Sequence, residues 1–204
     1  MRRVWLVALA VAWLTAPVLA QQIREPYPLH EGEHWTYRVN DGVGTYQLTR
    51  KLESVTHNND SSEDYRFVNS TPDQTWKEWF TYYEVKFFRT GVNWPAQNRW
   101  LFYEPGWPQL QRPLKVGDRS SYEGQLKEGE TIKTVLEMTK AAAIETVKVP
   151  AGEFRAMRVE LTQAIGDQLL RKTEWYADGV GIVKSVVDDG QHLIVTELLE
   201  YEIP

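Results

Sequence analysis

The sequence predicts an all-β, or nearly all-β, fold: a single antiparallel β-domain of about ten strands, arranged as an incomplete barrel or a sandwich. Aromatic and β-branched residues are frequent after Gln22, and turn residues punctuate the chain at short intervals. Three Asp-Gly pairs, at positions 41–42, 178–179 and 189–190, suit tight hairpin turns. Residues 155–161 alternate in polarity, which predicts a strand with Met157 and Val159 inward and Arg158 outward.

The first twenty residues have the features of a secretory signal peptide. Arg2 and Arg3 precede an apolar run from Val4 to Leu19, and Ala20 provides a small residue for cleavage. The run is shorter than the ~20 apolar residues that span a bilayer. The chain is therefore expected to be exported, to the periplasm or the exterior, with no integral membrane span after signal cleavage.

Composition excludes several classes of function. The formal net charge is −5 and no basic run is present, so nucleic acid is not an expected partner. The chain contains no Cys, so neither disulfides nor thiol chemistry can operate. Residues 21–204 are long enough for one packed core, and we expect a single domain.

A ten-residue pattern occurs twice in the chain. Residues 28–37 and 113–122 both read Pro-Leu-x-x-Gly-x-x-x-x-Tyr, and each copy precedes a predicted strand. The repeat suggests two related halves, 27–104 and 112–204, joined by a connector rich in proline between them. The alternative is that a glycine turn leading into an aromatic strand occurs twice by chance.

The first copy contains His30-Glu31-x-x-His34, which resembles the zinc motif of metalloproteases. That motif needs both histidines on one helix face, whereas Pro28 and Gly32 favour a turn that leads into a strand. In an extended chain the two histidines would lie ~13 Å apart, too far to share an ion. We therefore expect no metal site here.

Aromatic residues are densest between Trp76 and Trp107. Within residues 76–80, Trp76, Glu78 and Phe80 share one strand face while Trp79 lies on the other, so at least one ring is directed away from a single core. Flat rings can line a groove for an apolar or sugar-like ligand; the alternative is that they fill the core. The candidate ligand-binding residues are Trp76, Trp79, Tyr82, Trp94, Trp100 and Trp107.

No catalytic set is evident, and we expect no enzyme activity and no cofactor. The chain has neither a Gly-x-Ser-x-Gly elbow nor a phosphate-binding glycine loop. The expected function is non-catalytic binding of an apolar or amphipathic ligand, or of an envelope partner. The alternatives are a structural or assembly subunit of the bacterial cell envelope and, less favoured, a carbohydrate-active hydrolase, whose carboxylate pair would leave no local signal.

One short segment, residues 139–145, is a candidate helix within the predicted β-domain.

Five segments together resemble a family of exported bacterial proteins of largely unknown function. They are YPLHEGEHWTY, RPLKVGDRSSYEG, VPAGEFRAMRVEL, TEWYADGVGIVKS and HLIVTELLEY. Members are described as TapB-like or are grouped with domains of unknown function. The resemblance implies an antiparallel β-rich domain like the incomplete barrel of periplasmic lipoprotein carriers, and it supplies no catalytic residues.

Overall fold

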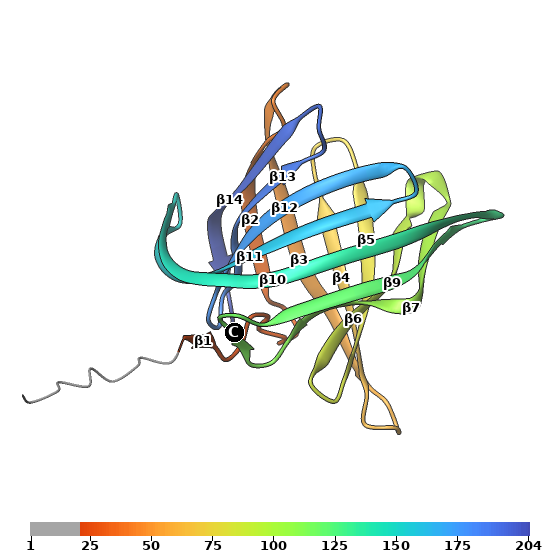
Figure 1. Cartoon of the computed structure of the whole chain (residues 1–204), viewed down its shortest axis with the longest axis horizontal. Coiled ribbons are helices and arrows are strands. Elements are labelled where there is room, and N and C mark those ends of the chain that lie inside the picture. Colours follow the sequence, from red (N-terminus) through yellow and green to blue (C-terminus); the bar gives the residue numbers. More distant parts are fainter. Residues whose placement is uncertain (1–20) are drawn as a thin grey trace, which may run out of the picture.

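The computed structural model describes residues 21–204, and the predicted signal peptide at 1–20 lies outside them. Within the described residues, twelve antiparallel strands form a closed barrel in the order β10-β11-β12-β13-β14-β2-β3-β4-β5-β6-β7-β9 (Figure 1). The barrel strands are β2 (His34–Asn40), β3 (Thr45–His57), β4 (Glu63–Ser70), β5 (Thr75–Tyr83), β6 (Lys86–Trp94), β7 (Arg99–Gln111), β9 (Arg119–Glu128), β10 (Thr131–Val149), β11 (Gly152–Ile165), β12 (Gln168–Ala177), β13 (Gly181–Asp188) and β14 (Leu193–Glu202).

The all-β, antiparallel prediction is confirmed, but the expected incomplete barrel or sandwich of about ten strands is wrong. The barrel is closed because β10 pairs with both β9 and β11 and β14 pairs with β2. Residues 139–145, the helix candidate, lie inside the 19-residue strand β10. Pairing on both sides overrides the helix propensity of its alanines, and a bulge between Ala141 and Ala143 absorbs the irregularity.

The expected proline-rich connector is in large part strand β7. β7 pairs with β6 through most of its length, whereas its pairing with β9 in the described chain is confined to Phe102–Glu104. Pro105 and Pro108 follow directly after that paired stretch. Proline cannot donate to a strand ladder, so it is tolerated where one edge of the strand is unpaired.

A short second sheet covers one end of the barrel. β1 (Gln22–Ile23) pairs with β8 (Leu114–Lys115), and Figure 1 shows β1 beneath the barrel close to the C-terminus. Ile23 is fully buried in a cluster that includes Leu110, Met157 and Tyr176. The first residues of the described chain therefore belong to the core.

The repeated ten-residue pattern forms two equivalent turns. Gly32 and Gly117 have φ of 97° and 94°, a conformation that glycine adopts without strain. Gly32 N–H donates to Leu52 O at 3.0 Å and Leu52 N–H to Glu33 O at 2.9 Å; the second turn repeats this arrangement with Ala141 in place of Leu52, at 2.8 and 2.9 Å. The two segments therefore form the same turn, and the relation between the two halves stays a prediction.

Aromatic side chains fill much of the barrel interior. Phe67, Phe80 and Phe87 are buried, and the Phe80 and Phe87 rings stack with centroids 4.7 Å apart. A barrel of this strand number encloses more space than wall side chains alone fill. Among residues 21–204, no helix is long and apolar enough to cross a membrane.

Candidate functional site

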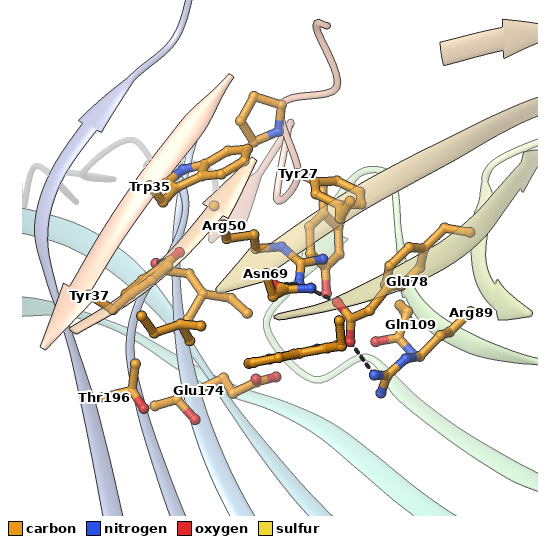
Figure 2. A pocket seen from close by; sticks show the side chains of 18 of the residues that line it. Tyr27, Trp35, Tyr37, Arg50, Asn69, Glu78, Arg89, Gln109, Glu174 and Thr196 are labelled. Atoms are coloured by element: carbon orange, nitrogen blue, oxygen red, sulfur yellow. Dashed lines mark hydrogen bonds and ion pairs between the residues drawn. The ribbon is translucent and has the colours of Figure 1, made fainter. Parts of the chain in front are cut away.

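Two neighbouring cavities occupy the barrel interior. Chamber A, of about 230 Å³, is bounded mainly by β2–β5, and chamber B, of about 290 Å³, lies toward β7, β10, β11 and β12. Figure 2 shows the polar and aromatic side chains that point into chamber A. Five residues line both chambers and define what we call the waist: Tyr27, Arg89, Gln109, Lys172 and Glu174.

An ion triad lies on the wall of chamber A. Glu78 on β5 accepts hydrogen bonds from Arg50 on β3 and from Arg89 on β6 (Figure 2). Arg50 also donates to Asn69 Oδ1 at 3.0 Å, and its guanidinium lies 4.1 Å from the centroid of the Phe67 ring. Burial alone would raise the pKa of Glu78, but Arg89 and Arg50 outweigh burial and lower this pKa to about 2. Glu78 is therefore ionised in the folded protein at neutral pH.

A second polar row comes from alternate residues of β12. Lys172 Nζ lies 2.5 Å from one oxygen of Glu174, and the Tyr176 hydroxyl donates to the other at 2.5 Å. The Tyr27 hydroxyl lies 3.1 Å from that of Tyr176. Burial is the main reason that the pKa of Tyr27 lies well above its usual range. The phenol is therefore neutral and available for hydrogen bonding.

A third buried carboxyl group faces chamber B. Glu137 on β10 accepts hydrogen bonds from Thr139 at 3.1 Å and from Gln163 at 3.0 Å. Burial raises the pKa of Glu137, and the hydrogen bonds only partly oppose that shift. The environment of Glu137 thus disfavours a negative charge.

The structure does not gather the aromatic residues proposed as ligand-binding into one site. Trp76 lines chamber A and Trp107 lines chamber B. The Trp79 and Trp100 rings lie on the outer wall, 4.9 Å apart. Tyr82 packs against the interior aromatic cluster, and Trp94 lies beneath the Arg99 guanidinium at 4.7 Å.

Sequence reasoning missed the charged residues of the interior. Lys172, Glu174 and Tyr176 alternate on one face of a strand, and Glu78 lies between Trp76 and Phe80 on one face of another. The second pattern was visible in the sequence as a shared face. Without the order of the strands, however, nothing indicated that the charged residues of different strands meet inside a barrel.

The His30–His34 stretch is a turn followed by a strand, as predicted. His30 Nδ1 lies 2.7 Å from Glu33, a residue whose side chain is fully buried, and His34 lies 3.7 Å from Glu202. The two histidines thus contact different carboxylates. Across residues 21–204, no group of three or more His, Asp or Glu side chains is arranged to hold a metal ion.

A seam in the wall adjoins chamber B. Where β7 and β9 stop pairing, a cavity of about 180 Å³, the seam cavity, lies between them. Pro108, Gln109 and Leu110 line both the seam cavity and chamber B. Ser120 pairs with the inward-facing, buried Thr139, yet Ser120 is exposed. The seam is therefore a place where solvent reaches the inner face of the barrel.

Tyr122 on β9 forms a hydrogen bond to β7 beside this seam. Its hydroxyl donates to Pro105 O at 2.7 Å, and its side chain folds over Gly124, where an added Cβ would lie 2.1 Å from the hydroxyl oxygen. We expect Gly124→Ala to displace Tyr122 and to lower the free energy of unfolding by about 1–3 kcal/mol, measured by urea denaturation. Tyr122→Phe, which removes only the hydroxyl, should lower it by about 1 kcal/mol. If Gly124→Ala were neutral, Tyr122 would not hold the seam.

Comparisons with known proteins place this architecture among exported bacterial proteins. A DUF3108-like family model matches residues 106–196. A crystal structure of a candidate exported protein with a YmcC-like fold from Bacteroides fragilis has a TM-score of 0.57 at 15% identity, covering 87% of this chain and 98% of its own. A candidate lipoprotein from Parabacteroides distasonis has a TM-score of 0.54 at 14% identity, with the same coverage. A search of curated proteins finds no match.

The chain therefore has the fold of these exported proteins. At 14% and 15% sequence identity, the similarity to these structures shows a shared fold and does not show a shared function. The family-model match covers most of the second predicted half and part of strand β7. The resemblance to the TapB-like family stays a prediction, because none of these matches bears that name.

Proposed function

We propose that the protein is exported and binds a small amphipathic molecule, without catalysis, inside its barrel. The observation that carries the proposal is the pair of chambers that meet at a charged waist. Together they have the volume of a ligand of modest size, and their walls combine aromatic rings with a few buried polar groups. Ligand sites commonly have this composition: mostly apolar, with few convergent polar groups.

The proposed site lies inside the barrel and not in a groove formed by one aromatic stretch. Trp76 contributes to it from chamber A and Trp107 from chamber B. The outer rings of Trp79 and Trp100 have no part in it. Export is supported by the N-terminal sequence and by the names of the structural neighbours.

The seam between β7 and β9 is the proposed entrance. Gln109 lines the seam cavity and both chambers, and its side-chain amide is held only by a long contact of 3.4 Å to Trp107 O. Rotation of this one side chain would connect the seam to the waist. Elsewhere around the described barrel, each strand pair has at least five residues in register, so the β7–β9 junction is the weakest part of the wall.

The test is fluorescence titration with N-phenyl-1-naphthylamine, a neutral aromatic probe whose emission rises in apolar surroundings. We expect saturable binding to the wild-type protein. Ser120→Phe should fill the seam cavity and slow the fluorescence rise. Glu123→Phe on the same strand should not, because Glu123 is exposed, does not line the seam cavity and pairs with the exposed Leu136. Absence of saturable binding would overturn the proposed function. Equal rates for both variants would place the entrance elsewhere.

A further inference from the structure

We propose that the ligand carries one acidic group, and that Arg89 and Lys172 bind this group at the waist. This inference rests on the proposed interior site and names the chemical class of its ligand: a monoanion, such as a carboxylate, sulfonate or phosphate monoester anion, with an apolar body. It is carried by the sharing of one carboxylate between two arginines, by the unsatisfied Nε of Arg89 and by the placement of the two cations.

Three cationic side chains and three carboxyl groups line the two chambers: Arg50, Arg89 and Lys172, and Glu78, Glu174 and Glu137. Arg50 and Arg89 share the single carboxylate of Glu78, while Lys172 is matched by Glu174. The three cationic side chains are between 22% and 39% exposed, and both carboxylates are at most 8% exposed. A charge held inside a protein is stable only when it is paired. Because Arg89 shares the carboxylate of Glu78 with Arg50, a bound monoanion would give Arg89 a second anionic partner.

One hydrogen-bond donor of the waist has no acceptor. In the described part of the chain, Arg89 Nε is buried and makes no hydrogen bond. Buried donors without an acceptor are rare in native proteins. An anionic oxygen group is an acceptor only, so it would satisfy the Arg89 Nε donor.

The two cations approach the waist from opposite walls. Arg89 lies on β6 and Lys172 on β12, strands that are far apart around the barrel (Figure 1). Both side chains nevertheless line both chambers. An acidic group between them would contact both at once. Glu137 is the remaining carboxyl group of chamber B, and burial raises its pKa, which disfavours its negative charge.

The rest of the lining accommodates an apolar body. Chamber A presents Trp35, Phe67 and Phe80, and chamber B presents Leu161, Ile165 and Leu170. An amphiphile could thus place its acidic group at the waist and its body in either chamber. This division is the usual means by which a few polar groups fix the orientation of an apolar ligand.

The experiment compares two probes that differ only in an acidic group. 1-Anilinonaphthalene-8-sulfonate has the skeleton of N-phenyl-1-naphthylamine with one added sulfonate. We expect the sulfonate probe to bind the wild-type protein at least about tenfold more tightly than the neutral probe, as for one good charge pair. Displacement of each probe by decanoate and by decanol repeats the comparison on an alkyl chain.

Variants on one strand separate the waist from the outer wall. Lys172→Gln should weaken the sulfonate probe by about tenfold and leave the neutral probe unchanged. Arg171→Gln, its neighbour on β12 with an exposed side chain, makes the same change in charge and should affect neither. Arg89→Gln, with folding checked by circular dichroism, should weaken the sulfonate probe at least as much as Lys172→Gln.

The outcomes distinguish this inference from the proposed function. If both probes bind the wild-type protein equally, or if Lys172→Gln and Arg171→Gln behave alike, the acidic group is wrong while the interior site stands. If neither probe binds, both proposals fall. A sulfonate preference that is lost in Lys172→Gln alone supports the assignment.

Discussion

Glu78→Gln is expected to destabilise the protein by about 3–5 kcal/mol. The substitution keeps the shape of the side chain but leaves Arg50 and Arg89 without their shared carboxylate, and these two side chains are only 24% and 22% exposed. Removing one member of a buried ionic group is strongly destabilising, because the remaining charges stay in a poorly solvated place. For a chain of this length the melting temperature should fall by roughly 10 °C.

The matched control for Glu78→Gln lies on the outer wall. Glu53 also pairs with two cations, Arg66 at 2.6 Å and Lys77 at 3.3 Å, but its side chain is 36% exposed. Glu53→Gln should change the free energy of unfolding by no more than about 1 kcal/mol. Equal effects of the two substitutions would show that the interior triad behaves as a surface ion pair.

The same triad predicts an acid-sensitive stability. The pKa of Glu78 is about 2 in the folded protein, below its ordinary value of 4.5, so the unfolded chain binds more protons between these values. The contribution of Glu78 is therefore complete above about pH 4.5 and decreases as the pH falls toward 2, by about 3 kcal/mol in all. Urea denaturation at a series of pH values should show a steeper loss for the wild-type protein than for Glu78→Gln.

Local sequence patterns were enough to predict the strands and two of their turns. The repeated Pro-Leu-x-x-Gly segments form equivalent turns, and the alternation at 155–161 correctly places Met157 and Val159 inside. Period-two alternation, however, defines two faces and does not say which one is inside. On β10 the sequence groups Ile132, Leu136 and Met138 on one face, and that face is outside.

On β10 three apolar residues face outward and two polar residues face inward, the reverse of a strand that packs on an apolar core. This reversal is why the interior site could not be predicted. Glu137 and Thr139 point inward, where they meet Gln163 from the neighbouring strand. Such an arrangement is possible because the barrel encloses a polar cavity. The number of strands, and with it the size of that cavity, depends on the pairing of β10 with both neighbours, which no local pattern specifies.

Closure was missed for a similar reason. Prolines at 105 and 108 indicate a break in the chain when they are read locally, but they need only one unpaired edge, which the seam provides. The features that suggested an open connector are thus the features that weaken the wall at its proposed entrance. The two prolines do mark an interruption, but it is an interruption of the pairing between β7 and β9 and not of the strand itself.

Tyr27→Ala is expected to lower the free energy of unfolding by about 3–5 kcal/mol, as for other large aromatic residues truncated in a core. Tyr27 lies between the chambers, and its ring contacts those of Phe87, at 5.1 Å, and Tyr176, at 5.5 Å. Its backbone oxygen also accepts a hydrogen bond from Arg112, which ties the first residues of the described chain to the β7–β8 region.

Tyr27→Phe is the control, because it keeps the ring and removes only the hydroxyl contact to Tyr176; it should destabilise by about 1 kcal/mol. The truncation also removes the partition between the chambers, so Tyr27→Ala should bind probes longer than either chamber accommodates, such as a C16 carboxylate, more tightly than the wild-type protein does. Differential scanning calorimetry and probe displacement measure the two effects separately. A melting temperature unchanged by Tyr27→Ala would mean that the Tyr27 ring does not contribute to the packed core. It would also mean that Tyr27 does not separate the two chambers.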